Sequence, residues 1–164
     1  MASIGKFPWA DVPGYIACQM LGAFLGACVV YLQYLPHWKA NEDKGTKLAV
    51  FCTGPAIRNT PANFISEFIG TFILVFGILG LGTVTMAPGL GTVAVGFLIW
   101  VIGLSLGGST GYAINPARDL GPRIAHFLLP IAGKGDSDWA YSWIPVIAPI
   151  CGAVVAALTF NAIF

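Results

Sequence analysis

Hydrophobic positions in this chain run in long, nearly unbroken stretches. Four of them lie at about residues 14–35, 63–86, 89–109 and 142–163. Each is close to the ~20 residues that an α-helix needs to cross a bilayer. From Phe68 to Ala117 no Lys, Arg, Asp or Glu occurs. The pattern predicts an all-α membrane protein with four spanning helices in a single domain. The second and third are antiparallel neighbours, because only the break Ala87-Pro88 separates them.

A fifth segment, at about residues 116–129, reads PARDLGPRIAHFLL and is too short to cross. A length of ~10 to 14 residues is typical of a re-entrant helix. Asn115 is a good N-cap, and Pro116 suits the first helical turn. Lipid cannot satisfy the backbone groups of the preceding residues, so this segment must line a wet cavity or be buried in protein.

Composition agrees with this class of protein. Of the 164 residues, 57% are hydrophobic and only 9% are charged, against about 25% in soluble domains. The mean hydropathy is +0.80. The net charge is +1, and the sequence has no stripe of Lys and Arg that could form a basic surface for binding nucleic acid.

Small residues recur every four positions in three of the predicted helices. The stripes are Cys18, Gly22 and Gly26, then Gly103, Gly107 and Gly111, then Gly152 and Ala156. Because helices in lipid associate by close backbone contact, we expect tight crossings there. The alternative is that glycine is simply common in membrane helices.

Arg118 is the first charge after the uncharged block and falls in the first turn of the short helix. A cation is unfavourable at this positive end of the helix dipole, although Asp119 beside it partly offsets the cost. Intramembrane Arg usually marks a solute pathway or a paired site. Its donors and those of Asn115 suit a neutral hydroxyl-bearing solute, while the positive charge opposes cations. The alternative is a structural pair of Arg118 with Asp119 capping a surface helix.

Glu67 is the second isolated charge. It could relay protons, but we favour a structural role, in which the carboxylate accepts N–H bonds from irregular backbone. Neither an enzyme nor a metal site is indicated. The sequence GLSLG at 103–107 fits the nucleophile-elbow pattern, yet it lies within a predicted spanning helix instead of a strand-to-helix turn.

With these residues, the chain resembles the major intrinsic protein family, the aquaporins, and most closely its aquaglyceroporin or glycerol facilitator branch. The most specific element is GYAINPARDLGPR, residues 111–123, which resembles the second Asn-Pro-Ala signature of the family and its following Arg. The stretch SEFIGTFILVFG, residues 66–77, is similar to the helix that opens the second repeat.

The resemblance implies roles for individual residues. Asn115, Pro116 and Ala117 would form the signature at the half-helix junction, after pore-lining carbonyls from Gly111, Tyr112, Ala113 and Ile114. Arg118, Tyr112 and Gly103 would form the selectivity filter. A glycine at 103, where water-only members have histidine, would leave a wider opening, and Asp119 is similar to glycerol-conducting members.

The family fold has six spanning helices and two half-helices, whereas four and one are predicted here. We therefore expect the C-terminal part of a channel that encloses no pore by itself. In its full-length form it would pass water, glycerol and similar small neutral solutes. The resemblance implies no cofactor, a homotetramer in the lipid of the cell membrane, and a cytoplasmic C-terminus. The last point conflicts with the positive charges at residues 39–58, which favour the opposite orientation.

Two alternatives to a passive channel remain open: a non-conducting structural membrane protein and a proton-coupled carrier.

Overall fold

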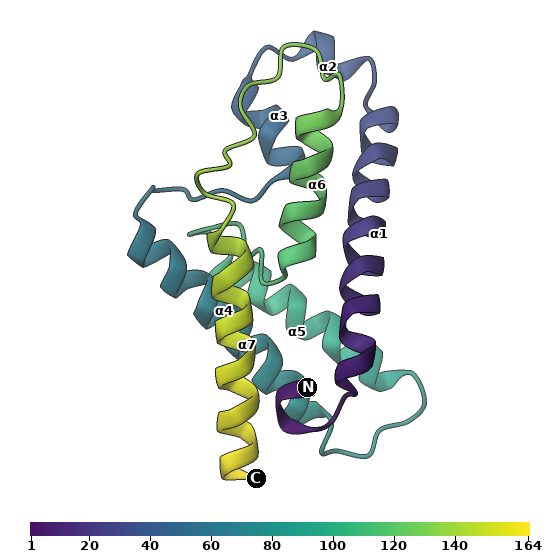
Figure 1. Ribbon diagram of the computed structural model, residues 1–164, viewed down its shortest axis with the longest axis vertical. Coiled ribbons are helices and arrows are strands. Elements are labelled where there is room, and N and C mark those ends of the chain that lie inside the picture. The colour runs from purple at the N-terminus through teal and green to yellow at the C-terminus, as the bar shows by residue number, and fades with distance from the viewer.

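The computed structural model describes residues 1–164 and is entirely helical (Figure 1). Two short 3-10 turns, Ala2–Ile4 and Trp9–Asp11, precede seven α-helices. These are α1 (Val12–Gln33), α2 (His37–Ala40), α3 (Lys44–Phe51), α4 (Thr60–Leu81), α5 (Leu90–Leu106), α6 (Pro116–Leu128) and α7 (Ile144–Ile163). The all-α prediction is therefore confirmed.

Three of these helices, including α4 and α7, are long and apolar enough to cross a membrane. The third predicted span, 89–109, is shorter in the structure: α5 has 17 residues and a length of about 25 Å. The segment predicted at 63–86 also lies earlier, at Thr60–Leu81. It begins early because the side chain of Asn59 accepts a hydrogen bond from the N–H of Ala62, 3.1 Å away.

Two short helices, α2 and α3, were not predicted, because their four and eight residues show no long apolar pattern. Asp43 caps α3 by accepting hydrogen bonds from Gly45 N–H at 2.8 Å and from the Thr46 hydroxyl at 2.6 Å. The Thr46 and Gly45 bonds lower the pKa of Asp43. The connection after α1 is therefore a structured segment that covers one end of the molecule (Figure 1).

The helices pack in pairs, with α4 against α7 and α1 against α6 (Figure 1). A Cβ on Gly152 of α7 would lie 2.4 Å from the carbonyl oxygen of Phe68 on α4. A Cβ on Gly121 of α6 would lie 2.7 Å from Ala23 Cβ. These two positions accept only glycine, because neighbouring backbone occupies the space of a side chain.

The prediction of tight crossings therefore holds at Gly152 and is wrong at Gly22 and Gly26. A Cβ at either α1 position would meet nothing within 4 Å. Both glycines instead face a hollow beside α6.

Helix α6 begins inside the molecule and runs in the same direction as α1 (Figure 1). Its first residues share a hollow with Gln19 and Gly22. These lie seven and ten residues past Val12, near the middle of the 22-residue α1. Thirteen residues give α6 a length of about 20 Å, less than the ~30 Å of a bilayer core.

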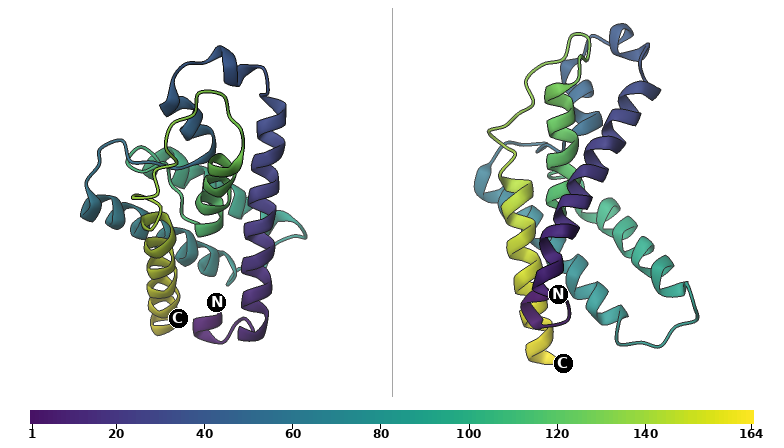
Figure 2. Two further views of the ribbon diagram at one scale, coloured as in Figure 1. Left: turned by 45° about the horizontal axis from the view of Figure 1, so that its top comes forward. Right: turned by 45° about the vertical axis from the view of Figure 1, so that its right-hand side comes forward.

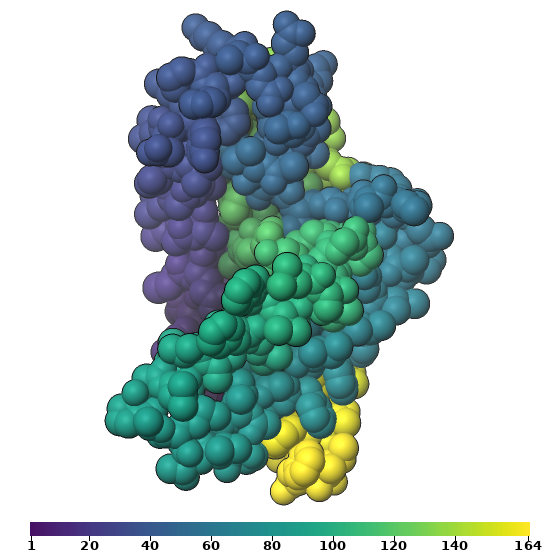
Figure 3. Space-filling model, turned by 180° about the vertical axis from the view of Figure 1, so that it is seen from behind, coloured from purple at the N-terminus to yellow at the C-terminus, as the bar shows by residue number.

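Helix α5 packs mainly on α4 and stands apart from the other helices (Figure 2). Viewed from behind, α5 runs diagonally across the near side and α1 forms one edge, and green atoms of the region that includes α6 show between them (Figure 3). Helix α6 itself packs against α1, α7 and α3.

The far end of α6 is fastened by Lys134. Its ammonium donates to the carbonyl oxygens of His126, Phe127 and Leu129 at 2.6, 2.6 and 2.7 Å. A cation is favourable at this negative end of the helix dipole. Burial lowers the pKa of Lys134. The interaction fixes where the half-helix stops.

Candidate functional site

The tip of α6 is set by Asn115, which has the extended backbone of an N-cap. Its side-chain Oδ1 accepts a hydrogen bond from Ala117 N–H at 2.9 Å. Pro116 has no N–H to satisfy. Since the oxygen of the amide is committed to the cap, its NH₂ donors remain available to the hollow next to the tip.

The residues before the cap form an irregular backbone run. Gly111, Tyr112 and Ile114 all have positive φ, at 77°, 40° and 44°. Such φ values are rare for residues other than glycine. They mark backbone strain that contacts with the surrounding structure must stabilise. None of the carbonyls from 111 to 114 accepts a hydrogen bond from the protein. These four oxygens are free acceptors.

Glu67, in the middle of α4, holds this run from behind. Its buried carboxylate accepts hydrogen bonds from the Thr110 hydroxyl at 2.6 Å, Ala113 N–H at 3.0 Å and Ile114 N–H at 2.8 Å. One turn along α4, a Cβ on Gly70 would lie 3.0 Å from Ile114 Cγ2. Two of the four backbone donors of the run, at Ala113 and Ile114, are thus satisfied on the α4 side.

The ring of Tyr112 lies against Gly103 on α5 and against Gly107, directly after the end of α5. A Cβ on Gly103 would lie 3.0 Å from Tyr112 Cζ, and one on Gly107 would lie 2.7 Å from Tyr112 Cδ1. Sequence reasoning expected Gly103 to widen an opening. That expectation stays a prediction; what the structure adds is that the aromatic ring of Tyr112 lies directly next to that glycine.

Arg118 lies beside Tyr112, with its guanidinium carbon 5.5 Å from the ring centroid. Its side chain is exposed and lines the hollow. The predicted relief of its charge by Asp119 is wrong. The Asp119 carboxylate instead pairs with Arg123, at 2.8 Å, and both side chains are fully buried. Consecutive residues of a helix do not face each other, whereas residues four apart do.

Arg123 and Thr53 are therefore polar residues near the site that sequence reasoning missed. The i, i+4 spacing of Asp119 and Arg123 was a usable signal. No local pattern links Thr53 to Asp119, because 66 residues separate them.

The tip of α6 opens on a hollow of about 490 Å³ between α1, α3 and α6. Its lining residues are Gln19, Gly22, Ala23, Gly26, Ala27, Val30, Val50, Phe51, Asn115, Ala117, Arg118 and Pro122. One wall, from α1, is mostly small and apolar. The other carries the donors of Asn115 and Arg118.

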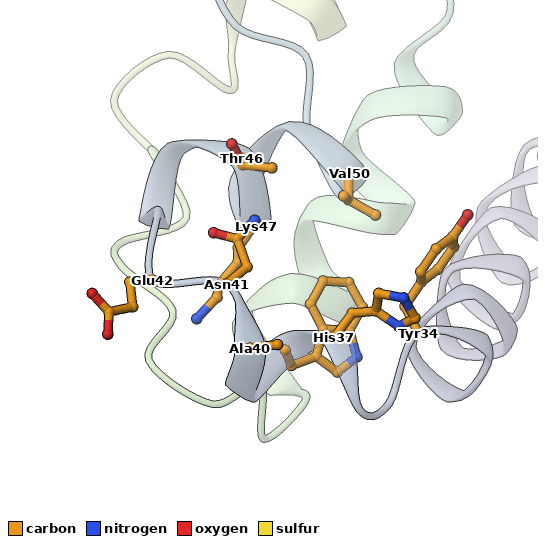
Figure 4. Close-up of a pocket in the computed structure, with 9 residues that line it drawn as sticks. Tyr34, His37, Ala40, Asn41, Glu42, Thr46, Lys47 and Val50 are labelled. Carbon is orange, nitrogen blue, oxygen red and sulfur yellow. The ribbon is translucent and has the colours of Figure 1, made fainter.

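A second cavity, of about 520 Å³, lies at the end of the molecule that α2 and α3 cover (Figure 4). Thr46, Lys47 and Val50 reach it from α3, whereas Tyr34 and His37 reach it from the end of α1 and the start of α2 (Figure 4). Val50 lines both this cavity and the hollow. The two spaces therefore adjoin along α3. No group of three or more His, Cys, Asp or Glu side chains could hold a metal ion.

Residues 1–160 match the family described as Major intrinsic protein. The chain is 61% identical to the probable glycerol uptake facilitator protein of Thermotoga maritima, over all of this chain and 70% of that protein. It is 58% identical to the glycerol uptake facilitator protein of Bacillus subtilis, over all of this chain and 60% of that protein.

A solved structure, the aquaglyceroporin from Plasmodium falciparum, matches with a TM-score of 0.81 at 31% identity. The match covers 98% of this chain and 67% of that one. The chain thus spans 60% to 70% of the length of these relatives.

These relatives are facilitators and a channel, which confirms the prediction that the chain is not an enzyme. The helical fold and the tip of the half-helix agree with the family that matches residues 1–160. The chain belongs to the major intrinsic protein family, and it is similar to glycerol uptake facilitators.

Proposed function

We propose that this chain supplies part of the wall of a passive channel for glycerol, water and similar small neutral solutes. The observation that carries the proposal is the hollow at the tip of α6. It presents the donors of Asn115 and Arg118 opposite small apolar residues of α1. The channel is formed by the complete protein, of whose relatives this chain spans 60% to 70%.

The chemistry of this hollow suits a polyol. Hydroxyl groups need both donors and acceptors. Asn115 and Arg118 supply the donors, and in this proposal the free carbonyls of 111–114, directly before Asn115 in the chain, supply the acceptors. The carbon chain of the solute can face Gly22, Ala23 and Gly26 without losing hydrogen bonds. In this proposal Arg118, Tyr112 and Gly103 form the filter, with the ring of Tyr112 seated on the glycine.

Cations are opposed at the same place. The first turn of α6 carries the positive end of the helix dipole, and Arg118 adds a full charge that no carboxylate neutralises. A neutral solute meets no such barrier. In this proposal Glu67 has a structural role, because its oxygens are occupied by donors of the run behind the filter.

The chain is an integral membrane protein. We propose the cell membrane as its location, with a cytoplasmic C-terminus. We also propose a homotetramer, since α1 and α5 expose large apolar side chains such as Leu25, Phe97 and Trp100 that lipid or a neighbouring subunit would cover. No cofactor is needed for passive diffusion.

The test uses the complete gene product in liposomes, with shrinking and swelling recorded under water and glycerol gradients. We expect both solutes to pass faster than in empty liposomes, with no response to an imposed pH gradient. A response to pH would identify a proton-coupled carrier instead. No excess flux of either solute would identify a non-conducting membrane protein.

A blocking variant links the flux to this hollow. A Cβ on Gly22 meets nothing within 4 Å, so Gly22→Trp would place its indole in the hollow without displacing a neighbour. We expect water and glycerol flux to fall about tenfold or more. Gly14→Trp is the matched control, because Gly14 is equally open but lies outside the hollow. Equal fluxes in the two variants would contradict the proposed path.

A further inference from the structure

Asp119 is directed away from Arg118 by four hydrogen bonds. Thr53 donates to its Oδ1 through the backbone N–H at 2.8 Å and the hydroxyl at 2.6 Å. Arg123 donates through Nε to Oδ2 at 2.9 Å and through Nη2 to Oδ1 at 2.8 Å. Three of these donors converge on Oδ1 and one on Oδ2, so Oδ1 has no free acceptor site.

Thr53 is the part of this arrangement that comes from outside α6. It follows α3, and its carbonyl oxygen also accepts a hydrogen bond from Arg123 Nη2 at 2.8 Å. A Cβ on Gly111 would lie 3.5 Å from Thr53 Cβ. Thr53 thus contacts the acid of α6 and the start of the carbonyl run at once.

The charges divide accordingly. Arg123 and Asp119 are fully buried and neutralise each other. Arg118 has no carboxylate partner and faces the hollow beside Tyr112. A weaker pair with Arg123 would leave part of the Asp119 charge uncompensated, and its field would lower the positive potential at the neighbouring guanidinium of Arg118. The contacts of Asp119 therefore affect the field in the hollow.

We propose that Thr53 is a specificity-determining positioning residue for the channel. Its hydroxyl holds Asp119 in the pair with Arg123, and Arg118 thereby keeps its full charge and its donors for the solute. Thr53 touches no solute and acts only through Asp119. This inference rests on the proposed function, in which Arg118 opposes cations.

The test compares Thr53→Val, which replaces the hydroxyl with a methyl group, with Thr53→Ser, which retains the hydroxyl. The complete protein is placed in liposomes, and proton flux and glycerol flux are measured in the same preparation. Their ratio cancels the number of folded channels. We expect Thr53→Val to raise the ratio of proton to glycerol flux about tenfold, the lower end of the scale of one lost hydrogen bond to a charged group. Thr53→Ser should match the wild type.

A second readout does not depend on conduction. Phenylglyoxal modifies accessible guanidinium groups, and peptide mass spectrometry of the purified protein assigns the modified sites. We expect Arg118 to be modified less in Thr53→Val than in the wild type, with Arg58 as the exposed internal reference. If Thr53→Val does not fold, Thr53→Ala removes the same hydroxyl without adding bulk.

The proposal is overturned if Thr53→Val and Thr53→Ser give the same flux ratio, or if Arg118 modification is unchanged. A wild-type protein that carries no glycerol would instead refute the proposed function. In that case the modification of Arg118 would still decide whether Thr53 positions Asp119.

Discussion

The polar side chains near the tip of α6 differ in role because they differ in their hydrogen-bond partners. Asn115 commits its amide oxygen to the helix cap and keeps its donors. Glu67 commits its carboxylate to the backbone behind the carbonyl run. Arg118 has neither a carboxylate nor a carbonyl partner and rests beside an aromatic ring. Donors left without partners are those that a passing solute can use.

Replacing Arg118 with valine should loosen discrimination. The positive charge and its donors disappear from the hollow, so larger and charged solutes should enter. We expect their permeability relative to glycerol to rise about tenfold, which corresponds to a barrier lower by about 1.4 kcal/mol. The measurement is solute flux into liposomes. Lys39→Val is the control, because Lys39 is exposed and far from the hollow. Unchanged permeability ratios in Arg118→Val would contradict the filter role.

Replacing Glu67 with glutamine should reduce stability more than selectivity. The amide NH₂ would face one of the backbone N–H donors that the carboxylate now accepts, leaving that donor unsatisfied. We expect a loss of about 1–3 kcal/mol and a lower Tm in detergent. Glu42→Gln, at an exposed position, should leave Tm unchanged. A normally stable Glu67→Gln protein with altered selectivity would refute the structural role.

At the scale of the helices, α6 is fastened at both ends by side chains. Asn115 caps its start, and Lys134 satisfies three carbonyls at its end. In an irregular membrane segment these groups have no lipid partner, so unsatisfied ends would be costly. The position of the filter along the membrane therefore depends on both caps.

Replacing Lys134 with methionine should weaken the end of α6. The side chain keeps its length and apolar stem but loses the three donors. We expect a loss of about 1–2 kcal/mol, observed as a lower Tm and as faster hydrogen exchange in the last turn of α6. Lys39→Met is the matched control, since Lys39 makes no hydrogen bond through its side chain. Equal exchange rates in the two variants would show that the cap is dispensable.

Across the whole molecule, α6 packs against α1 and also against α7, which belongs to the pair of α4 and α7. α1 packs on α6, and α4 packs on α7 while its carboxylate reaches the carbonyl run. Gly121 and Gly152 set the separation within these pairs. The hollow therefore keeps its shape only if both crossings stay close.

Replacing Gly152 with alanine should open the crossing of α4 and α7. The added Cβ would lie 2.4 Å from the Phe68 carbonyl oxygen, and backbone cannot yield as a flexible side chain can. We expect a loss of about 1–3 kcal/mol and a lower Tm. In contrast, Gly80→Ala on α4 meets nothing within 4 Å and should be neutral. If the two variants were equally stable, close packing at Gly152 would not be needed.

The pattern of apolar residues was sufficient to predict the helical class, the half-helix and the cap at Asn115. These depend on local properties: length, capping chemistry and the position of proline. The helix bounds shifted by a few residues, because caps such as Asn59 set them. The short helices α2 and α3 escaped prediction, because segments of four and eight residues carry too little periodic signal.

What the sequence alone determined is that this apolar protein contains a short capped helix that does not cross the membrane, with an arginine near the start of that helix. Only the tertiary structure decided which partners the charges take. Asp119 pairs with Arg123 and Thr53 instead of Arg118, and the ring of Tyr112 fills the space beside Gly103. The reason is physical: hydrogen bonds and ring contacts act over a few ångströms. Chain segments 66 residues apart reach that range only after the helices have packed.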